Sequence, residues 1–366
     1  MKVIFIVNSV SATICIKRIE EFVAQGYEVE AYGFSQLEPQ KSIPKNFKIT
    51  TIGEYSSKSS YLDRMKVITK GVRFVINKHR SENDVIYYLY MLHVASVFRL
   101  FAAKDVKYIY EESDLRHTYS KSSFLRNTSE LIDKWVIKGA MLSVFTSEGF
   151  LEYHFKNRIP KNVHIITNRL DADIEQLPKC KEKEIDPRRL IFGFVGNLRF
   201  NTIVKFSDVF CENFPDYELH FYGTTLLKWV DKFKRLEKYS NCYFHGSFLN
   251  PKDLPTIYSS IDVVLSAYDT DSANHRYAEP NKLYEAIYFN TPIIVSKGTY
   301  LSKKVNKLNV GYEVDALDKK SICDLIKSMT IGSLNEKISS CKSIDSKYCI
   351  NNNQDFFDRI NSLINR

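Results

Sequence analysis

The segment from Ala278 to Ala286 carries a lysine and a glutamate at a spacing that can bind a nucleotide. It reads Ala-Glu-Pro-Asn-Lys-Leu-Tyr-Glu-Ala, and its proline is typical of a first helical turn. Lys282 and Glu285 are three residues apart, so in a helix they lie on one face. Lys282 at the helix N-terminus can bind a phosphate, and the Glu285 carboxylate can accept hydrogen bonds from a ribose diol. An exposed lysine–glutamate pair without any ligand explains the same spacing.

A second candidate site is the turn Phe194-Val195-Gly196-Asn197-Leu198-Arg199. Gly196 follows an apolar run, and without a Cβ atom it lets an anionic group approach the backbone closely. Arg199 and Lys205 come next and have the reach to neutralise phosphate oxygens. Gly223 ends a later apolar run in a similar way. An ordinary strand–helix turn with surface cations is the alternative interpretation.

Short apolar runs that alternate with helical patterns are expected to position these residues. We expect strands at 3–7, 28–33, 47–52, 84–89, 106–110 and 142–146, and again at 190–195, 218–222, 242–244, 263–265, 292–295 and 310–314. Helical patterns separate them, for example at 61–80, 93–103 and 122–138. Continuous apolar strands with helices between them predict parallel sheets that are covered on both faces.

The segment 176–189 interrupts this series because it is charged, contains two prolines and has no periodicity, so it is expected to be a linker. We therefore predict an α/β protein with two doubly wound, Rossmann-like domains that face a cleft, at residues 1–175 and 190–345. The last segment, 346–366, is expected to form a helix that packs back toward the N-terminal domain. In such sheets ligands collect at the carboxyl ends of the strands.

Several of these motifs resemble those of the group 1 glycosyltransferases. Pro280–Ala286, followed by Asn-Thr-Pro-Ile-Ile-Val at 290–295, is similar to the nucleotide-sugar-binding helix of that family. Phe194–Leu198, His245-Gly246-Ser247 and the stretch 253–265 resemble other blocks of its donor domain and occur in the same order. The resemblance is specific over residues 190–300. It implies the GT-B fold, with an acceptor-binding first domain and a nucleotide-sugar-binding second domain.

The resemblance also assigns roles on the donor side. Glu285 matches the carboxylate that binds the nucleotide ribose. Asn281, Lys282 and Leu283 match the family's loop and helix start that face the donor sugar and phosphates. Further donor-binding candidates are the turn residues Gly196, Asn197 and Gly223. Arg199 and Lys205 are candidates for the basic pair on the diphosphate.

Two departures from the family concern the reacting sugar. The family signature has a second glutamate eight positions before Glu285, where this chain has Tyr277. Glu279, offset by two positions, is the candidate for that catalytic role. The first loop, 8–13, has small polar residues in place of a glycine-rich turn, and Ser9 is its candidate on the acceptor side.

Similar enzymes have a histidine in the first domain that contacts the reacting sugar. His117 is the candidate for this role, with Asp114 beside it, and His93 is a rival after another strand.

The formal charge of +9 predicts anionic partners. No nucleic-acid recognition motif is present, so nucleic acid is not expected. A basic amphipathic stretch at 57–80 can instead rest on an anionic membrane surface, although an ordinary solvated helix face explains it too. The seven cysteines and eight histidines form no zinc-ligand pattern, and Asp269-Thr270-Asp271 is interpreted as a solvated loop. We therefore expect no metal and no cofactor.

The expected function is that of a glycosyltransferase in surface-polysaccharide synthesis. The resemblance implies a nucleotide-sugar donor of UDP or GDP type, a glycan or lipid-linked acceptor, and retention of configuration without a metal. The chain has no apolar run long enough to cross a membrane and no signal-peptide pattern, so the expected location is cytoplasmic, at or near the inner face of the membrane. The alternative is a catalytically degenerate relative that only binds nucleotide sugars.

Overall fold

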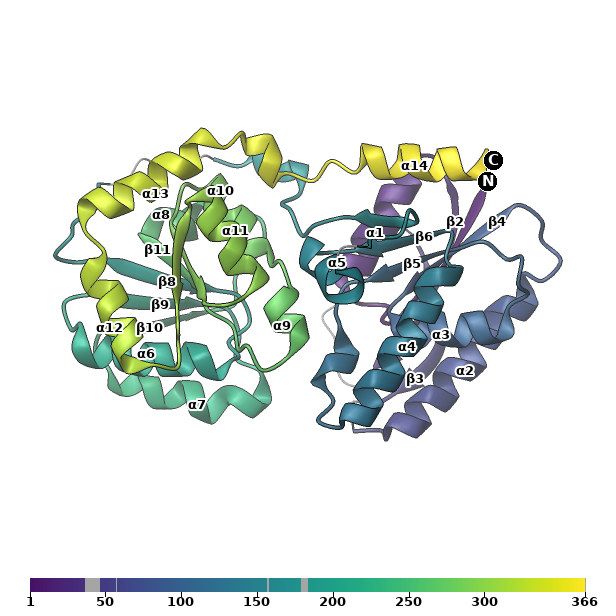
Figure 1. Cartoon of the computed structure of the whole chain (residues 1–366), viewed down its shortest axis with the longest axis horizontal. Coiled ribbons are helices and arrows are strands. Elements are labelled where there is room, and N and C mark those ends of the chain that lie inside the picture. Colours follow the sequence, from purple (N-terminus) through teal and green to yellow (C-terminus); the bar gives the residue numbers. More distant parts are fainter. Residues whose placement is uncertain (37–46, 57, 157, 179–183, 366) are drawn as a thin grey trace. The chain divides into compact units, whose positions relative to one another are not determined.

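The computed structural model describes residues 1–36, 47–56, 58–156, 158–178 and 184–365, and it divides into two units. Unit 1 comprises Met1–Ile166 and Gln354–Arg366, and unit 2 comprises Thr167–Asn353. Each unit has its own parallel sheet with helices on both faces (Figure 1). The prediction of two doubly wound α/β domains is confirmed.

Unit 1 contains a seven-stranded parallel sheet in the order β3-β2-β1-β4-β5-β6-β7. Its strands are β1 (Lys2–Val7), β2 (Glu28–Gln36), β3 (Ile49–Tyr55), β4 (Val85–Tyr90), β5 (Tyr108–Glu112), β6 (Leu142–Phe145) and β7 (Val163–Ile165). Its helices are α1 (Thr13–Ala24), α2 (Tyr61–Lys78), α3 (Leu92–Phe101), α4 (Ser123–Gly139), α5 (Glu148–Phe155) and α14 (Gln354–Ile364), with a 3-10 turn at Arg116–Tyr119. The strand order reverses between β1 and β4, which is where such sheets bind ligands.

Unit 2 repeats this arrangement with six parallel strands in the order β10-β9-β8-β11-β12-β13. Its strands are β8 (Ile191–Val195), β9 (Glu218–Tyr222), β10 (Cys242–Gly246), β11 (Val263–Ser266), β12 (Ile293–Ser296) and β13 (Gly311–Val314). Its helices are α6 (Asn201–Asn213), α7 (Val230–Lys234), α8 (Leu254–Ser260), α9 (Ala273–Tyr277), α10 (Asn281–Tyr288), α11 (Tyr300–Leu308), α12 (Lys319–Ser328) and α13 (Ile331–Ser343). Short 3-10 turns lie at Ala172–Gln176, Leu227–Trp229, Arg235–Lys238 and Ser346–Cys349.

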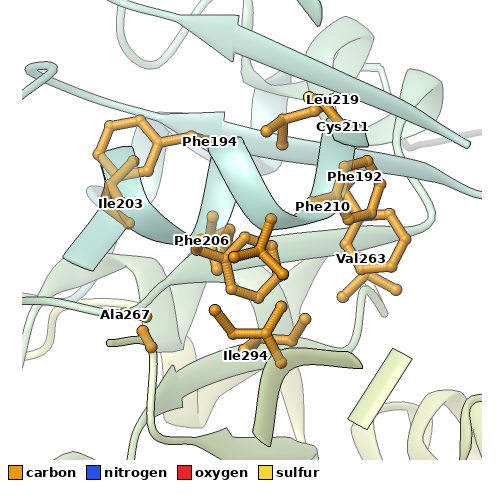
Figure 2. Packing of buried hydrophobic residues seen from close by; sticks show 14 of the residues in the cluster. Phe192, Phe194, Ile203, Phe206, Phe210, Cys211, Leu219, Val263, Ala267 and Ile294 are labelled. Atoms are coloured by element: carbon orange, nitrogen blue, oxygen red, sulfur yellow. The ribbon is translucent and has the colours of Figure 1, made fainter. Parts of the chain in front are cut away.

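Large aromatic side chains hold α6 against the sheet of unit 2. Figure 2 shows Phe206 and Phe210 of α6 packing among Phe192, Val263 and Ile294 of the sheet. The ring centroids of Phe192 and Phe210 are 4.7 Å apart, and the rings meet edge to face. Burial of such rings from water is a major stabilising term, so α6, the helix that follows the Gly196 turn, is anchored to the sheet.

The C-terminal helix α14 packs in unit 1, as expected for the end of the chain. Phe356 and Phe357 are buried, and the ring centroid of Phe357 lies 5.0 Å from that of Phe22 in α1. In Figure 1 the yellow α14 accordingly lies beside the purple α1.

The units divide after Ile166 and not in the predicted linker at 176–189. The reason is that Leu170 and Ile174 are buried in the core of unit 2, where Leu170 forms a bridge to Ile350. Residues 346–353 pack there as well, while 179–183 of the predicted linker lie outside the described residues. The strand β7 was not expected, because the polar His164 interrupts its apolar residues.

Candidate functional site

Lys282 and Glu285 of α10 form a pair in the interior of unit 2. The Lys282 Nζ atom donates to Glu285 Oε1 at 3.2 Å, and the Tyr258 hydroxyl of α8 donates to Oε2 at 2.9 Å. Glu285 is fully buried and the Lys282 side chain is 12% exposed, so an exposed surface pair is ruled out. Each carboxylate oxygen has two lone pairs, so Glu285 can still accept a hydrogen bond from a ligand hydroxyl.

The start of α10 offers backbone donors beside this pair. Pro280 is the N-cap residue, and none of the described side chains caps the helix. The backbone amides of a first helical turn have no partner inside the helix, and the helix dipole makes this end positive. With Lys282 in the first turn and Asn281 exposed there, this end of α10 can bind an anionic group.

The glycine turns lie under Lys282. Gly196 has φ +135, and a Cβ atom there would be 3.5 Å from Lys282 Cε, so the lysine side chain passes over this turn. The Gly196 and Leu198 amides already donate to Tyr222 O at 2.8 Å and Thr224 O at 2.9 Å. The Gly196 amide, which we expected to bind the donor, therefore donates to a carbonyl of the fold instead. The absence of a side chain at Gly196 leaves room for the Lys282 side chain. Gly223 packs against the same turn, since a Cβ atom there would lie 1.8 Å from Gly196 O.

The two cations expected on the diphosphate lie at the surface. Arg199 is exposed and its guanidinium lies 5.0 Å from the centre of the Phe200 ring. Lys205 is exposed on α6. Asn197 is also exposed, and its Oδ1 accepts from the Thr224 hydroxyl at 3.5 Å.

The start of α6 is capped by Asp269, which the sequence analysis assigned to a solvated loop. Asp269 accepts from the amides of Asn201 at 3.1 Å and Thr202 at 2.8 Å, and from the Thr202 hydroxyl at 3.0 Å. The interpretation as a solvated loop holds for Thr270 and Asp271, which are exposed, whereas Asp269 is half-buried and supplies the cap that Phe200, the residue before α6, does not. A carboxylate occupies this helix start, so α10 and not α6 offers its N-terminus to an anion.

Glu279 is buried and paired, although it was expected to face the sugar. One oxygen, Oε1, accepts from Lys304 Nζ at 2.7 Å and from the Tyr284 hydroxyl, while Oε2 has no partner among the described residues. Burial opposes the charge on Lys304, yet Glu279 and Tyr284 hold the pKa of Lys304 well above its usual range. Lys304 was missed in the sequence, where nothing relates a residue of α11 to Glu279.

Leu283 also lies in the interior, fully buried in the unit 2 core. It is one of the residues that anchor α10 in this core, and its donor-binding role stays a prediction. Its backbone amide donates to Pro280 O at 3.2 Å.

In unit 1, the predicted residues follow the carboxyl ends of three neighbouring strands. Ser9 follows β1, His93 follows β4, and Asp114 and His117 follow β5. The His117 side chain is 3% exposed, with Nε2 at 3.3 Å from the Tyr153 hydroxyl. Burial lowers the pKa of His117 to about 4, with a further contribution from His154, so its ring is neutral at pH 7.

The other three make local contacts. Burial and Arg116 lower the pKa of His93 to about 4. The Asp114 carboxylate is 3.9 Å from Arg116 Nε, and the Ser9 hydroxyl is 3.1 Å from that of Ser11. No helix in the described ranges is long and apolar enough to cross a membrane.

The chain is similar to known glycosyltransferases in sequence and in fold. The family Glycosyl transferases group 1 matches residues 177–343. The succinoglycan biosynthesis protein ExoL of Rhizobium meliloti is 23% identical over 279 residues, which are 72% of this chain and 69% of that protein. Among solved structures, sucrose-phosphate synthase of Thermosynechococcus elongatus has a TM-score of 0.68 at 13% identity and covers 99% of this chain and 98% of its own. Anabaena HepE in complex with UDP has a TM-score of 0.66 at 14% identity, with 99% and 100% covered. The chain thus has two Rossmann-like units in the GT-B fold of these glycosyltransferases, and its residues 177–343 match the family Glycosyl transferases group 1.

Proposed function

We propose that the protein transfers a sugar from a nucleotide-sugar donor to a hydroxyl of a glycan or lipid-linked acceptor in surface-polysaccharide synthesis. The observation that carries this proposal is the uncapped start of α10, with Lys282 passing over Gly196 and paired with a buried Glu285. The UDP complex of HepE supports a UDP-type donor, and the succinoglycan role of ExoL supports a polysaccharide product.

The donor-side chemistry follows from these charges. When the sugar leaves, negative charge develops on the nucleotide diphosphate, and fixed cations and helix dipoles stabilise it without reorganisation. Lys282 and the first-turn amides of α10 supply this stabilisation in our proposal, so the transfer itself needs no metal. Glu285 would accept hydrogen bonds from the ribose. It also accepts a hydrogen bond from the Lys282 ammonium group and so holds that group over the Gly196 turn. The proposed stereochemical outcome is retention.

The residues proposed to contact the sugar are His117 and Glu279. The His117 side chain is 3% exposed, so the atom proposed for this contact is its backbone carbonyl, which can accept a hydrogen bond from a sugar hydroxyl. Glu279 Oε2, which has no partner among the described residues while Oε1 binds Lys304, is the atom proposed for contact with the sugar. Both roles stay predictions. A protein that binds the donor without transferring it would show nucleotide binding and no product with any acceptor.

Nucleotide binding tests the donor site most directly. We would measure thermal unfolding with UDP, GDP, ADP and CMP, each with and without EDTA. We expect one nucleotide to stabilise the protein, by about 2.7 kcal/mol at 100 times its Kd, with EDTA leaving this shift unchanged. Lys282→Met should abolish most of the shift, whereas Lys320→Met, which removes a lysine that is 84% exposed in unit 2, should not. Equal shifts in both variants, or no shift with any nucleotide, would contradict the proposed site.

We also propose that α2 contacts an anionic membrane near the acceptor. Tyr61, Leu62 and Phe74 are 73%, 71% and 54% exposed. An open groove of about 710 Å³ on this helix is lined by both apolar and basic side chains. The lining residues are Leu62, Met65, Lys66, Thr69, Lys70, Arg73, Phe74 and Asn77. Apolar side chains within a basic surface favour binding at an anionic lipid interface.

Co-sedimentation with vesicles tests this contact. The protein should sediment with phosphatidylglycerol vesicles at low salt and much less with phosphatidylcholine vesicles. Lys66→Glu with Lys70→Glu should abolish binding, while Lys319→Glu with Lys320→Glu, an exposed pair in unit 2, should retain it. Equal loss in both double variants would show that net charge alone controls sedimentation.

A further inference from the structure

Four buried side chains from separate elements of unit 1 meet at one point. They are Glu112 at the end of β5, His117 in the 3-10 turn, Asp133 in α4 and His154 in α5. His154 Nε2 lies 2.8 Å from Glu112 Oε2 and 3.6 Å from Asp133 Oδ2, and His117 Nδ1 lies 3.9 Å from the same Asp133 oxygen. One ligand atom each from Glu112, Asp133 and His154 lies within 4.8 Å of the others.

The cluster lacks a cation for its two carboxyl groups. Glu112 is 1% exposed and Asp133 is fully buried, and no lysine or arginine of the described segments forms an ion pair with either. A buried carboxylate is costly unless a cation or a proton accompanies it.

Three polar atoms of these side chains lack a hydrogen-bond partner among the described residues. Asp133 Oδ2, which faces both histidines, has no hydrogen-bond partner among the residues described, and the same holds for Glu112 Oε1 and His154 Nδ1. The other Asp133 oxygen accepts from the Tyr110 hydroxyl at 3.0 Å, which orients the carboxylate. Buried polar atoms without partners are rare in folded proteins and call for a bound ion, a water or a shared proton.

We propose that Glu112, Asp133 and His154, with His117 as the fourth ligand, bind a zinc ion that stabilises unit 1. Zinc prefers four nitrogen and oxygen ligands in a tetrahedron, whose neighbouring ligand atoms are about 3.4 Å apart for bonds of about 2.1 Å. The observed distances of 2.8, 3.6 and 3.9 Å lie on both sides of this value. The ion would balance both carboxylates and join β5 to α4 and α5. This proposal does not rest on the proposed donor chemistry.

A second histidine–carboxylate group in unit 1 provides the contrast. His79 Nδ1 lies 2.7 Å from Glu82 Oε1, and Nε2 lies 3.6 Å from Glu30 Oε2. Here both carboxylates are about one third exposed and pair with Lys2. His79 therefore serves as the matched control: it is equally buried and also has two carboxylates, but their charge is already balanced.

The experiment is metal analysis of protein purified without a metal-affinity step. We expect about one zinc per chain by mass spectrometry of the metal content, retained in His79→Gln and lost in His154→Gln and Asp133→Asn. For chelator-treated wild type, added Co²⁺ should give the visible absorption of a tetrahedral site, and added Zn²⁺ should raise the unfolding temperature. Both measurements are made on the wild-type protein, so they do not depend on whether a variant folds.

Two outcomes would overturn the proposal. In the first, purified wild-type protein contains no metal, gives no cobalt spectrum and shows no zinc-dependent rise in unfolding temperature. Protons on the carboxyl groups would then balance the charge of the cluster. The other is an equal zinc response in His154→Gln. Failure of the donor proposal is separate, because it is read from nucleotide shifts and Lys282→Met. Chelation should lower the stability of unit 1 and leave the nucleotide shift in place.

Discussion

The buried carboxylate of Glu279 depends on a single lysine. Lys304 donates to it at 2.7 Å, and both residues are largely enclosed. Lys304→Met keeps most of the side-chain volume but leaves Glu279 without its cation, so we expect the free energy of unfolding to fall by about 3–5 kcal/mol. Adding Glu279→Gln should recover part of this loss, because the amide carries no charge. Urea unfolding of the two single variants and the double variant measures the coupling, and strictly additive losses would contradict it.

Gly223 is required by close packing of two turns. Its φ is +142, and a Cβ atom there would lie 1.8 Å from Gly196 O. We expect Gly223→Ala to cost about 3 kcal/mol or more, because backbone strain adds to a clash with the turn under Lys282. Gly246→Ala is the control, since Gly246 has φ +77 but no atom within 4 Å of a built Cβ, and it should cost only about 1–2 kcal/mol. Equal losses in urea unfolding would show that φ alone sets the requirement.

Glu30 makes the stability of unit 1 depend on pH. Burial opposes its charge, but hydrogen bonds from Lys2, Tyr32 and Lys78 lower the pKa of Glu30 from 4.5 to about 2. A lowered pKa stabilises the fold above pH 4.5, and this contribution disappears as the pH falls toward 2. Wild type should therefore be more stable than Glu30→Gln at pH 7, and the difference should shrink between pH 4.5 and pH 2. Glu28→Gln, at an exposed position of the same strand, controls for the lost charge. A difference that is constant with pH would contradict the assignment.

Among the elements, α6 depends on a carboxylate from a distant loop. Asp269 accepts the first two amides of this helix, and no residue next to the helix start replaces it. We expect Asp269→Ala to cost about 1–2 kcal/mol in urea unfolding, as the loss of an N-cap does. Asp271→Ala removes a carboxylate that is 79% exposed in the same loop and should have little effect. Similar losses in the two variants would mean that the loop, and not the cap, is responsible.

The elements themselves were largely predictable because their patterns are local. Runs such as Val3–Val7 and Ile191–Val195 are continuous and apolar, as expected for strands that are buried on both faces. In strand β7 the polar His164 separates the two apolar residues, so no such run appears. The cap of α6 by Asp269 joins residues far apart in the sequence, so no spacing rule could reveal it.

The candidate site was predictable only where its residues share one helix. Lys282 and Glu285 are three positions apart, and the structure brings them together. The partners that bury and fix the site, Tyr258 and Lys304, come from other elements and have no signal in the sequence. The burial of each candidate residue was not predictable either. Nothing in the sequence indicates that Glu279 is buried and Arg199 is exposed.

For the whole molecule, two separate cores predict two unfolding transitions. Unit 1 has a core that includes Phe22 and Phe357 of α14, and unit 2 has its own around Phe206 and Phe210. In differential scanning calorimetry, Phe357→Ala should lower one transition by the equivalent of about 3–5 kcal/mol, and the bound nucleotide should raise the other. Phe74→Ala, which truncates an aromatic side chain that is 54% exposed in unit 1, should move neither. A single transition that responds to both Phe357→Ala and the nucleotide would show instead that the units unfold together, and the stability of the donor site would then depend on the C-terminal helix.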